Sequence, residues 1–373
     1  MGLVRGSDPG ALLPLAPESG DWEEVVKEAS AQGLIPLLYR SLKGSEMGRE
    51  LPARVADRLE AQFFGVAARN MLLAAELREI LQAFEDQRLP CAPLRGLALA
   101  EALYGDITAR PMGDLDLLVQ KEDLPRVARI LRELGFREID RRPGFAQAFS
   151  YSLEFFKDRH GWIIVEPHWT IAYPPFADRV DMEGVWERCA RGRVVGAAAW
   201  LLGGEDLLLN LCLHLAHRDG AAPLLWFYEL DQLLRREQDV LDWSRILSVA
   251  SQAKQQALLF RALGRVKALF DTPIPDPVLD QPAAEPPRSV EGRLGRLFAE
   301  GSTVDGKESL ALLFTLAGFS AKLSYALALL FPSPEFMRLE YGLTRRSQLG
   351  FAYVRRCCRF AWESSKGVVK LLG

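Results

Sequence analysis

The chain contains the sequence Arg110-Pro111-Met112-Gly113-Asp114-Leu115-Asp116-Leu117-Leu118-Val119, in which two aspartates stand two positions apart at the start of an apolar run. The apolar residues after Gly113 predict a β-strand. Side chains alternate between the two faces of a strand, so Asp114 and Asp116 share one face, opposite Leu115, Leu117 and Val119. Neighbouring carboxylates repel each other, and a Mg²⁺ ion would relieve that repulsion because it prefers oxygen ligands. A pair of this kind is often a solvated turn, but the apolar strand around this one favours a metal site.

A third carboxylate, Glu166, follows the apolar residues Trp162–Val165. Its separation from Asp116 leaves room for a helix and a hairpin that would bring the two side by side. Three carboxylates could hold one or two metal ions, an arrangement that stabilises the attacking and leaving oxygens of an in-line phosphoryl displacement. His168 would share the strand face of Glu166, where it could contact the substrate or a metal-bound water, or make only a structural hydrogen bond.

Arg95 and Gly96 stand where a short apolar run, Leu89–Leu94, changes to the helical spacing of Gly96–Tyr104. The two prolines in that run predict an edge strand. A helix N-terminus offers free backbone N–H groups, glycine permits close approach, and arginine pairs with phosphate oxygens. Arg95 and Gly96 are therefore candidate nucleotide-binding residues, and Arg110 is a second candidate cation. Taken alone, each would be interpreted as a solvated arginine or an ordinary helix start.

Hydrophobic spacing divides the chain into three parts. Residues 1–84 are predicted to form a helical N-terminal region, residues 85–202 an α+β core with a mixed β-sheet, and residues 203–373 an all-helical C-terminal domain. Within the core, further strands are expected at Phe149–Phe156 and Trp162–His168.

The segment Leu310–Phe331 is apolar for nearly the thickness of a membrane, but Lys322 and two serines interrupt it. We expect a buried core helix here rather than a membrane span. After it, residues 335–373 hold eight basic and three acidic residues, a net charge of +5, with aromatic residues interleaved. This segment could contact an anionic membrane surface or nucleic acid, or form the solvated face of a packed helix.

The composition is that of an ordinary globular protein, with 46 basic and 49 acidic residues among 373. It excludes a disordered chain and a disulfide-stapled mini-protein, and the balanced charge argues against a surface that binds polyanions throughout. The five cysteines include no C-x-x-C pair, and prolines break the apolar residues Ala11–Pro17 that a signal peptide would need. We therefore expect a cytoplasmic protein.

Three segments together resemble the uncharacterised nucleotidyltransferases of the DNA polymerase β-like superfamily, which occur in bacterial biosynthetic gene neighbourhoods. The first is R-G-L-A-L-A-E-A-L-Y-G-D, from Arg95 to Asp106, the second is the quoted run with its two aspartates, and the third is V-E-P-H-W at Val165–Trp169. The helical segments Leu213–His217 and Trp226–Leu234 are similar to the C-terminal portion of the family.

The resemblance implies a mixed sheet flanked by helices, with Asp114, Asp116 and Glu166 as the metal-binding and catalytic acids. Gly96 would begin the phosphate-facing helix. The expected cofactor is Mg²⁺, with two ions, and an NTP would donate a nucleoside monophosphate to a small molecule, a peptide or a tRNA. Two departures stand out: Leu97 replaces the second small residue of the turn, and Arg95 replaces a common lysine, although arginine binds phosphate well.

Two other interpretations remain open. The chain could be a non-catalytic nucleotide-binding or scaffold protein of a biosynthetic complex, or it could associate with a membrane surface through residues 335–373. His214 and His217 stand three positions apart on a predicted helix, but no H-E-x-x-H sequence accompanies them, so a structural role is favoured over a zinc site.

Overall fold

The strand that carries Asp114 and Asp116 lies inside a mixed, five-stranded β-sheet. In this computed structural model the described residues are 21–139, 145–159, 161–173, 176–217, 222–279, 313, 316, 318–343 and 345–372. The strands are β1 (Cys91–Pro93), β2 (Asp114–Val119), β3 (Arg137–Glu138), β4 (Phe155–Asp158) and β5 (Trp162–His168). Their order is β1-β2-β5-β4-β3, with β2 and β5 parallel and the other neighbours antiparallel. The α+β class with a mixed sheet is therefore confirmed.

Two helices, α4 (Ala53–Asp86) and α6 (Leu124–Glu133), cover the sheet face opposite the aspartates. Their apolar side chains recur at helical spacing and pack on the alternate residues of the central strands, among them Leu117, Ile163 and Val165, which are fully buried. Each such side chain contributes about 1.5–3 kcal/mol to folding. Burial of this face determines which face the acidic side chains occupy.

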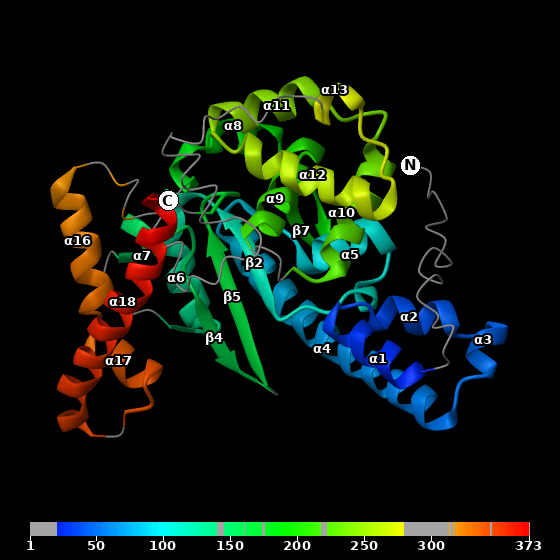
Figure 1. Ribbon diagram of the computed structural model, residues 1–373, viewed down its shortest axis with the longest axis horizontal. Helices are drawn as coiled ribbons and strands as arrows, with labels where there is room; N and C mark the ends of the chain where they lie inside the picture. Colours follow the sequence, from blue (N-terminus) through cyan, green and yellow to red (C-terminus); the bar gives the residue numbers. More distant parts are fainter. Residues whose placement is uncertain are drawn as a thin grey trace.

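Helices make up most of the remaining structure (Figure 1). At the N-terminal end, α1 (Trp22–Ala31), α2 (Ile35–Leu42) and α3 (Glu46–Arg49) lie near the start of α4, as the predicted helical lead-in requires. After β1 comes α5 (Gly96–Tyr104), and after β5 come α8 (Met182–Arg188) and a hairpin of β6 (Ala190–Val194) and β7 (Ala197–Leu201). The short 3₁₀ turns are Ile107–Ala109, Lys121–Asp123, Ala177–Arg179 and Arg346–Gln348.

The helices above the sheet in Figure 1 share a second hydrophobic core. They are α9 (Gly204–His217), α10 (Leu224–Glu237), α11 (Trp243–Gln252), α12 (Gln256–Phe270) and α13 (Asp276–Leu279). Leu99 of α5 is buried in the same core, so the helix that begins at Gly96 is packed against this helical group. Since α5 also follows β1 directly, it links the sheet to the C-terminal helices.

The strand predicted at Phe149–Phe156 is wrong over most of its length. Its first residue ends a short helix, α7 (Phe145–Phe149), and β4 begins only at Phe155. On α7 the rings of Phe145 and Phe149 lie one turn apart, and both contact the ring of Tyr325 on α16. Tyr325 is far away in the sequence, so the local pattern of aromatic residues could not show that they form a helix that packs against α16.

The prediction of a buried core helix at Leu310–Phe331 is also wrong for the part that is described. There α16 (Phe319–Leu330) buries only Tyr325 and exposes Phe319, Leu323 and Leu327. It packs against α18 (Leu349–Leu372), which also packs against α17 (Pro334–Glu340), at the left of Figure 1. Among the described residues, none of the helices has the length and apolar character that a membrane span needs.

Candidate active site

The parallel register of β2 and β5 assembles the acidic side chains. Asp116 is the direct partner of Glu166, and Leu118 is the partner of His168. Ligand atoms of Asp116, Glu166 and His168 all lie within 4.8 Å of one another. Asp114 occupies the same strand face at the exposed start of β2. Among the described residues, the structure thus forms its possible metal cluster from two of the predicted acids and the predicted substrate-contacting histidine.

The loop that leads into β2 is fixed from α4. The buried side-chain amide of Asn70 donates hydrogen bonds to the carbonyl oxygens of Ile107 and Arg110, both at 2.6 Å. Further along, the backbone N–H of Leu94 donates to the carbonyl oxygen of Asp116 at 3.0 Å, where β1 meets β2. These contacts place Arg95, which follows β1, beside Asp116 within β2.

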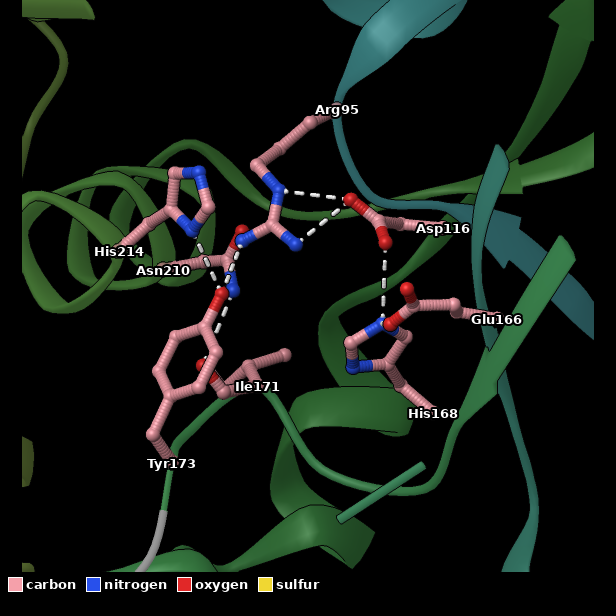
Figure 2. A network of polar contacts seen from close by, with 8 residues as sticks. All are labelled: Arg95, Asp116, Glu166, His168, Ile171, Tyr173, Asn210 and His214. Atoms are coloured by element: carbon pink, nitrogen blue, oxygen red, sulfur yellow. Dashed lines mark hydrogen bonds and ion pairs between the residues drawn. The ribbon is translucent and has the colours of Figure 1, made fainter. Parts of the chain in front are cut away.

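Arg95 makes an ion pair with Asp116 in which two guanidinium nitrogens share one carboxylate oxygen (Figure 2). Its Nε and Nη2 atoms donate to Oδ2 of Asp116 at 3.0 and 2.6 Å, and both side chains are largely buried. Burial alone would lower the pKa of Arg95, but the charge of Asp116 and its hydrogen bonds raise it, so the guanidinium stays protonated. A permanent positive charge therefore touches the central acid of the cluster.

His168 binds the other oxygen of the same carboxylate. Its Nε2 atom donates to Oδ1 of Asp116 at 3.1 Å and lies 3.7 Å from Oε2 of Glu166. Burial opposes ionisation of Asp116, but the charge of Arg95 and the hydrogen bonds from His168 and Arg95 hold its pKa well below the usual range. Asp116 is therefore ionised over the whole physiological range of pH.

The pKa values of the other two acids, Glu166 and Asp114, are shifted upward instead. Burial, followed by the charges of Asp116 and Asp114, raises the pKa of Glu166 to about 8. The pKa of Asp114 is also raised, first by desolvation of its carboxylate and then by the charge of Asp116. Carboxylates that repel each other in this way form a site that attracts a further cation.

Sequence reasoning missed one part of this network. The hydroxyl of Tyr173 accepts a hydrogen bond from Nη1 of Arg95 at 2.7 Å and lies 2.7 Å from Nδ1 of His214 on α9. Nearby, the side-chain amide of Asn210 donates to the carbonyl oxygen of Ile171 at 2.9 Å, which ties α9 to the segment that holds Tyr173 (Figure 2). His214 does have the structural role expected for it, whereas no sequence pattern marks Tyr173 as its partner.

Gly96 begins α5 in a left-handed backbone conformation, with φ of 55°. Residues other than glycine rarely adopt this backbone conformation, because their Cβ atom approaches the backbone too closely. A Cβ atom here would lie 3.7 Å from Sδ of Met112 and 4.0 Å from the carbonyl oxygen of Asp114, so the helix start adjoins the acidic strand. This turn requires glycine for its backbone geometry.

Arg110 lies apart from the cluster contacts. Its Nε atom donates to Oε1 of Glu229 on α10 at 2.7 Å, and both side chains are buried. The predicted phosphate contact from Arg110 would have to compete with this internal partner. Its charge still acts on the site, because it lowers the pKa of Asp114 in opposition to the larger effects.

The donor set fits a divalent cation. Two carboxylates and an imidazole lie within reach of a single ion, and a third carboxylate shares the strand face. Mg²⁺ is usually held by one or two carboxylates together with water and substrate phosphates, and Mn²⁺ also suits carboxylate and water ligands. The residues of this face therefore suit a metal ion whose coordination shell is completed by a phosphorylated substrate.

Comparison with known families agrees with this arrangement. The model of a family described as uncharacterised nucleotidyltransferase matches residues 18–271, more than half of the chain, including the whole five-stranded sheet and helices α1 to α12. A search of curated proteins finds no match. The chain therefore belongs to this uncharacterised family of nucleotidyltransferases.

Proposed function

We propose that the protein transfers a nucleoside monophosphate from an NTP to an acceptor in a biosynthetic pathway, with Mg²⁺ as its cofactor. The observation that supports this most is the cluster of Asp116, Glu166 and His168 on one face of the sheet, in which the two carboxylates are partly exposed and the histidine is buried. Asp114 extends the same row of side chains. The family supports the transfer of a nucleotide and leaves the acceptor open: a small molecule, a peptide or a tRNA.

In the proposed reaction an acceptor oxygen attacks the α-phosphorus, the bond to the bridging oxygen breaks, and pyrophosphate leaves. Divalent cations supply charge neutralisation at the phosphates when they are bound. Asp116 and Asp114 would provide ligands, and Glu166 would either complete the metal site or, in its ionised form, accept the proton of the acceptor hydroxyl. The N-terminus of α5 at Gly96 would steady the phosphate oxygens, and Arg95 would do so in competition with its contacts to Asp116 and Tyr173.

The proposal can be tested by incubating the chain with each α-labelled NTP, Mg²⁺ and candidate acceptors. Pyrophosphate release, together with transfer of the label, is the supporting result. A chain that binds NTP and metal but releases no pyrophosphate with any acceptor class would favour the non-catalytic nucleotide-binding or scaffold protein. Chelation of the metal should abolish the reaction, and its restoration by Mg²⁺ or Mn²⁺ would link the chemistry to the ion.

Binding of Mn²⁺ to the metal-free chain is expected to strengthen as the pH rises. Glu166 has a pKa of about 8 and is mostly protonated at pH 7, so it must lose its proton before it can bind an ion. Each pH unit below 8 should weaken binding by about tenfold, and binding at pH 7 should release about one proton. Calorimetry in buffers of different ionisation enthalpy measures both quantities. Binding that is independent of pH would contradict Glu166 as a ligand.

We also propose that α18 contacts an anionic membrane surface. Phe351, Val354 and Trp362 are exposed at spacings that align them along one side of the helix, and Arg355 and Arg359 lie next to them. The full chain should sediment with phosphatidylglycerol vesicles and not with phosphatidylcholine vesicles. Exchange of Phe351 and Trp362 for serine should reduce sedimentation severalfold. A chain that stays in the supernatant with both lipids would refute the contact.

A further inference from the structure

The acidic face of β5 continues past Glu166 toward the start of the strand. His168, Glu166, Ile164 and Trp162 alternate with residues whose side chains are fully buried in the core on the opposite face. Ile164 is the register partner of Asp114, so Trp162 lies just beyond the acidic pair on the same face. A row of side chains therefore leads from the candidate metal cluster to an aromatic residue at the strand entrance.

Trp162 is unusually open for its size, with 61% of its surface exposed. Its ring stacks on that of Phe156 in β4, with a centroid distance of 5.0 Å and an interplanar angle of 17°. The guanidinium carbon of Arg137 lies 4.6 Å from the centroid of the Phe156 ring. One face of the indole is thus supported by the protein, and the exposed surface is free to receive a flat ring.

The backbone at Trp162 is tied to the site. Arg69 of α4 donates from Nη2 to the carbonyl oxygen of Trp162 at 2.5 Å and to that of Gly113 at 3.0 Å. Gly113 directly precedes Asp114, so a single side chain links the entrances of β2 and β5. This link holds the aromatic pair in a set position relative to the acidic residues and reduces the cost of ordering it when a ligand binds.

A solvent-exposed stacked pair of this kind also has an ordinary explanation, since aromatic pairs across neighbouring strands stabilise sheets by about 0.2–1 kcal/mol. Sheet stabilisation does not require the outer face of the Trp162 indole to be exposed, or to lie next to the acidic side chains. Aromatic side chains on open sheet faces are a common means of binding bases, and each stacked base contributes about 1–3 kcal/mol. Four residues along a strand span roughly 13 Å, which a nucleotide or oligonucleotide can bridge.

We propose that Trp162, supported by Phe156, is a stacking platform for the heteroaromatic base of a nucleotide whose phosphate or hydroxyl group lies at the acidic face. The proposal rests on the function proposed above and adds a binding site for one part of its substrates. The base could come from the donor NTP or from the terminal nucleotide of an RNA acceptor. The nearby cations Arg137 and Arg69 are compatible with the anionic backbone of either ligand.

The test compares ligands with and without a base. Calorimetry in the presence of Mn²⁺ would measure the affinity of inorganic tripolyphosphate, of the four α,β-methylene NTP analogues and of a short single-stranded RNA. Trp162→Ala should weaken at least one base-bearing ligand by about fivefold or more and leave tripolyphosphate unchanged. Trp162→Phe retains a ring and should keep most of the affinity, whereas Trp162→Leu should behave like the alanine variant. Phe64→Ala is the matched control, because Phe64 is 55% exposed on α4 and its ring also packs on a neighbouring ring, that of Phe63, with a centroid distance of 5.4 Å.

A loss confined to the NTP analogues assigns the base to the donor, and a loss confined to RNA assigns it to the acceptor; both support the platform. Equal losses for tripolyphosphate and nucleotides would overturn it, and so would affinities for all base-bearing ligands that stay within twofold of the original chain. If the original chain binds neither tripolyphosphate nor any nucleotide, the proposed function itself fails, and the platform fails with it.

Discussion

Exchange of Asp116 for asparagine is expected to lower nucleotide transfer by at least about 10³-fold, because metal-based charge stabilisation at a phosphoryl group is worth several kcal/mol. The substitution keeps the shape of the side chain but removes the charge that Arg95 and His168 both contact. Metal binding should fall with activity. Rates of pyrophosphate release and calorimetric titration with Mn²⁺ measure the two losses on the same preparation.

Asp206 offers a matched control for this substitution. It is a buried aspartate of α9 that also pairs with an arginine through two hydrogen bonds, from Nε of Arg188 to Oδ2 at 2.8 Å and from Nη2 to Oδ1 at 2.9 Å. Asp206→Asn should reduce stability as Asp116→Asn does, yet leave metal binding intact. Full activity in the Asp116 variant would refute the site assignment, and equal losses of metal binding in both variants would point to unfolding instead.

Loss of Glu229 is expected to destabilise the protein by about 3–5 kcal/mol, since Glu229→Ala leaves the buried guanidinium of Arg110 without its partner. Burial raises the pKa of Glu229 even though Arg110 opposes the shift, so this pair is held at a desolvation cost. Exchange of both residues for apolar ones, Arg110→Met with Glu229→Leu, should recover most of the loss. Urea unfolding of the single and double variants measures the difference.

The exposed pair Arg129–Glu133 provides the comparison. Its N–O distance of 2.8 Å is close to the 2.7 Å of the buried pair, but both side chains are about half exposed. Glu133→Ala should change stability by at most about 0.5 kcal/mol, because solvent screens exposed pairs. If Glu229→Ala costs as little as Glu133→Ala, the buried pair does not link the loop before β2 to α10 in the manner described.

Local patterns in the sequence predict much of the core. Alternation in the segment from Asp114 to Leu117 identifies β2 and both of its faces, because Leu115 and Leu117 pack in the core opposite the aspartates. Toward the end of the strand both faces are buried, with Leu118 in a second hydrophobic cluster. The helix at Gly96–Tyr104 is found with its bounds, since apolar spacing begins at one glycine and ends at another. The boundaries between the three parts of the chain, at 84/85 and 202/203, stay predictions.

Partners that are far apart in sequence escape this reasoning. Arg110 offers a cation at a plausible place for a phosphate, but Glu229 reaches it from α10, 119 positions away in the chain. Tyr173 contacts Arg95 and His214 through the folding of the segment after β5, for which no periodic pattern exists. Such contacts depend on how elements pack, which hydrophobic period alone does not specify.

The ion pair between Arg95 and Asp116 reduces the need for a metal ion when the acidic cluster folds. Its guanidinium already neutralises the most strongly ionised acid of the cluster, so newly made chains can complete this part of the sheet before they encounter any metal ion. Zinc-finger domains, by contrast, depend on their ion for folding itself. Under the proposed metal dependence, a shortage of divalent cations would then reduce nucleotide transfer without unfolding this part of the sheet.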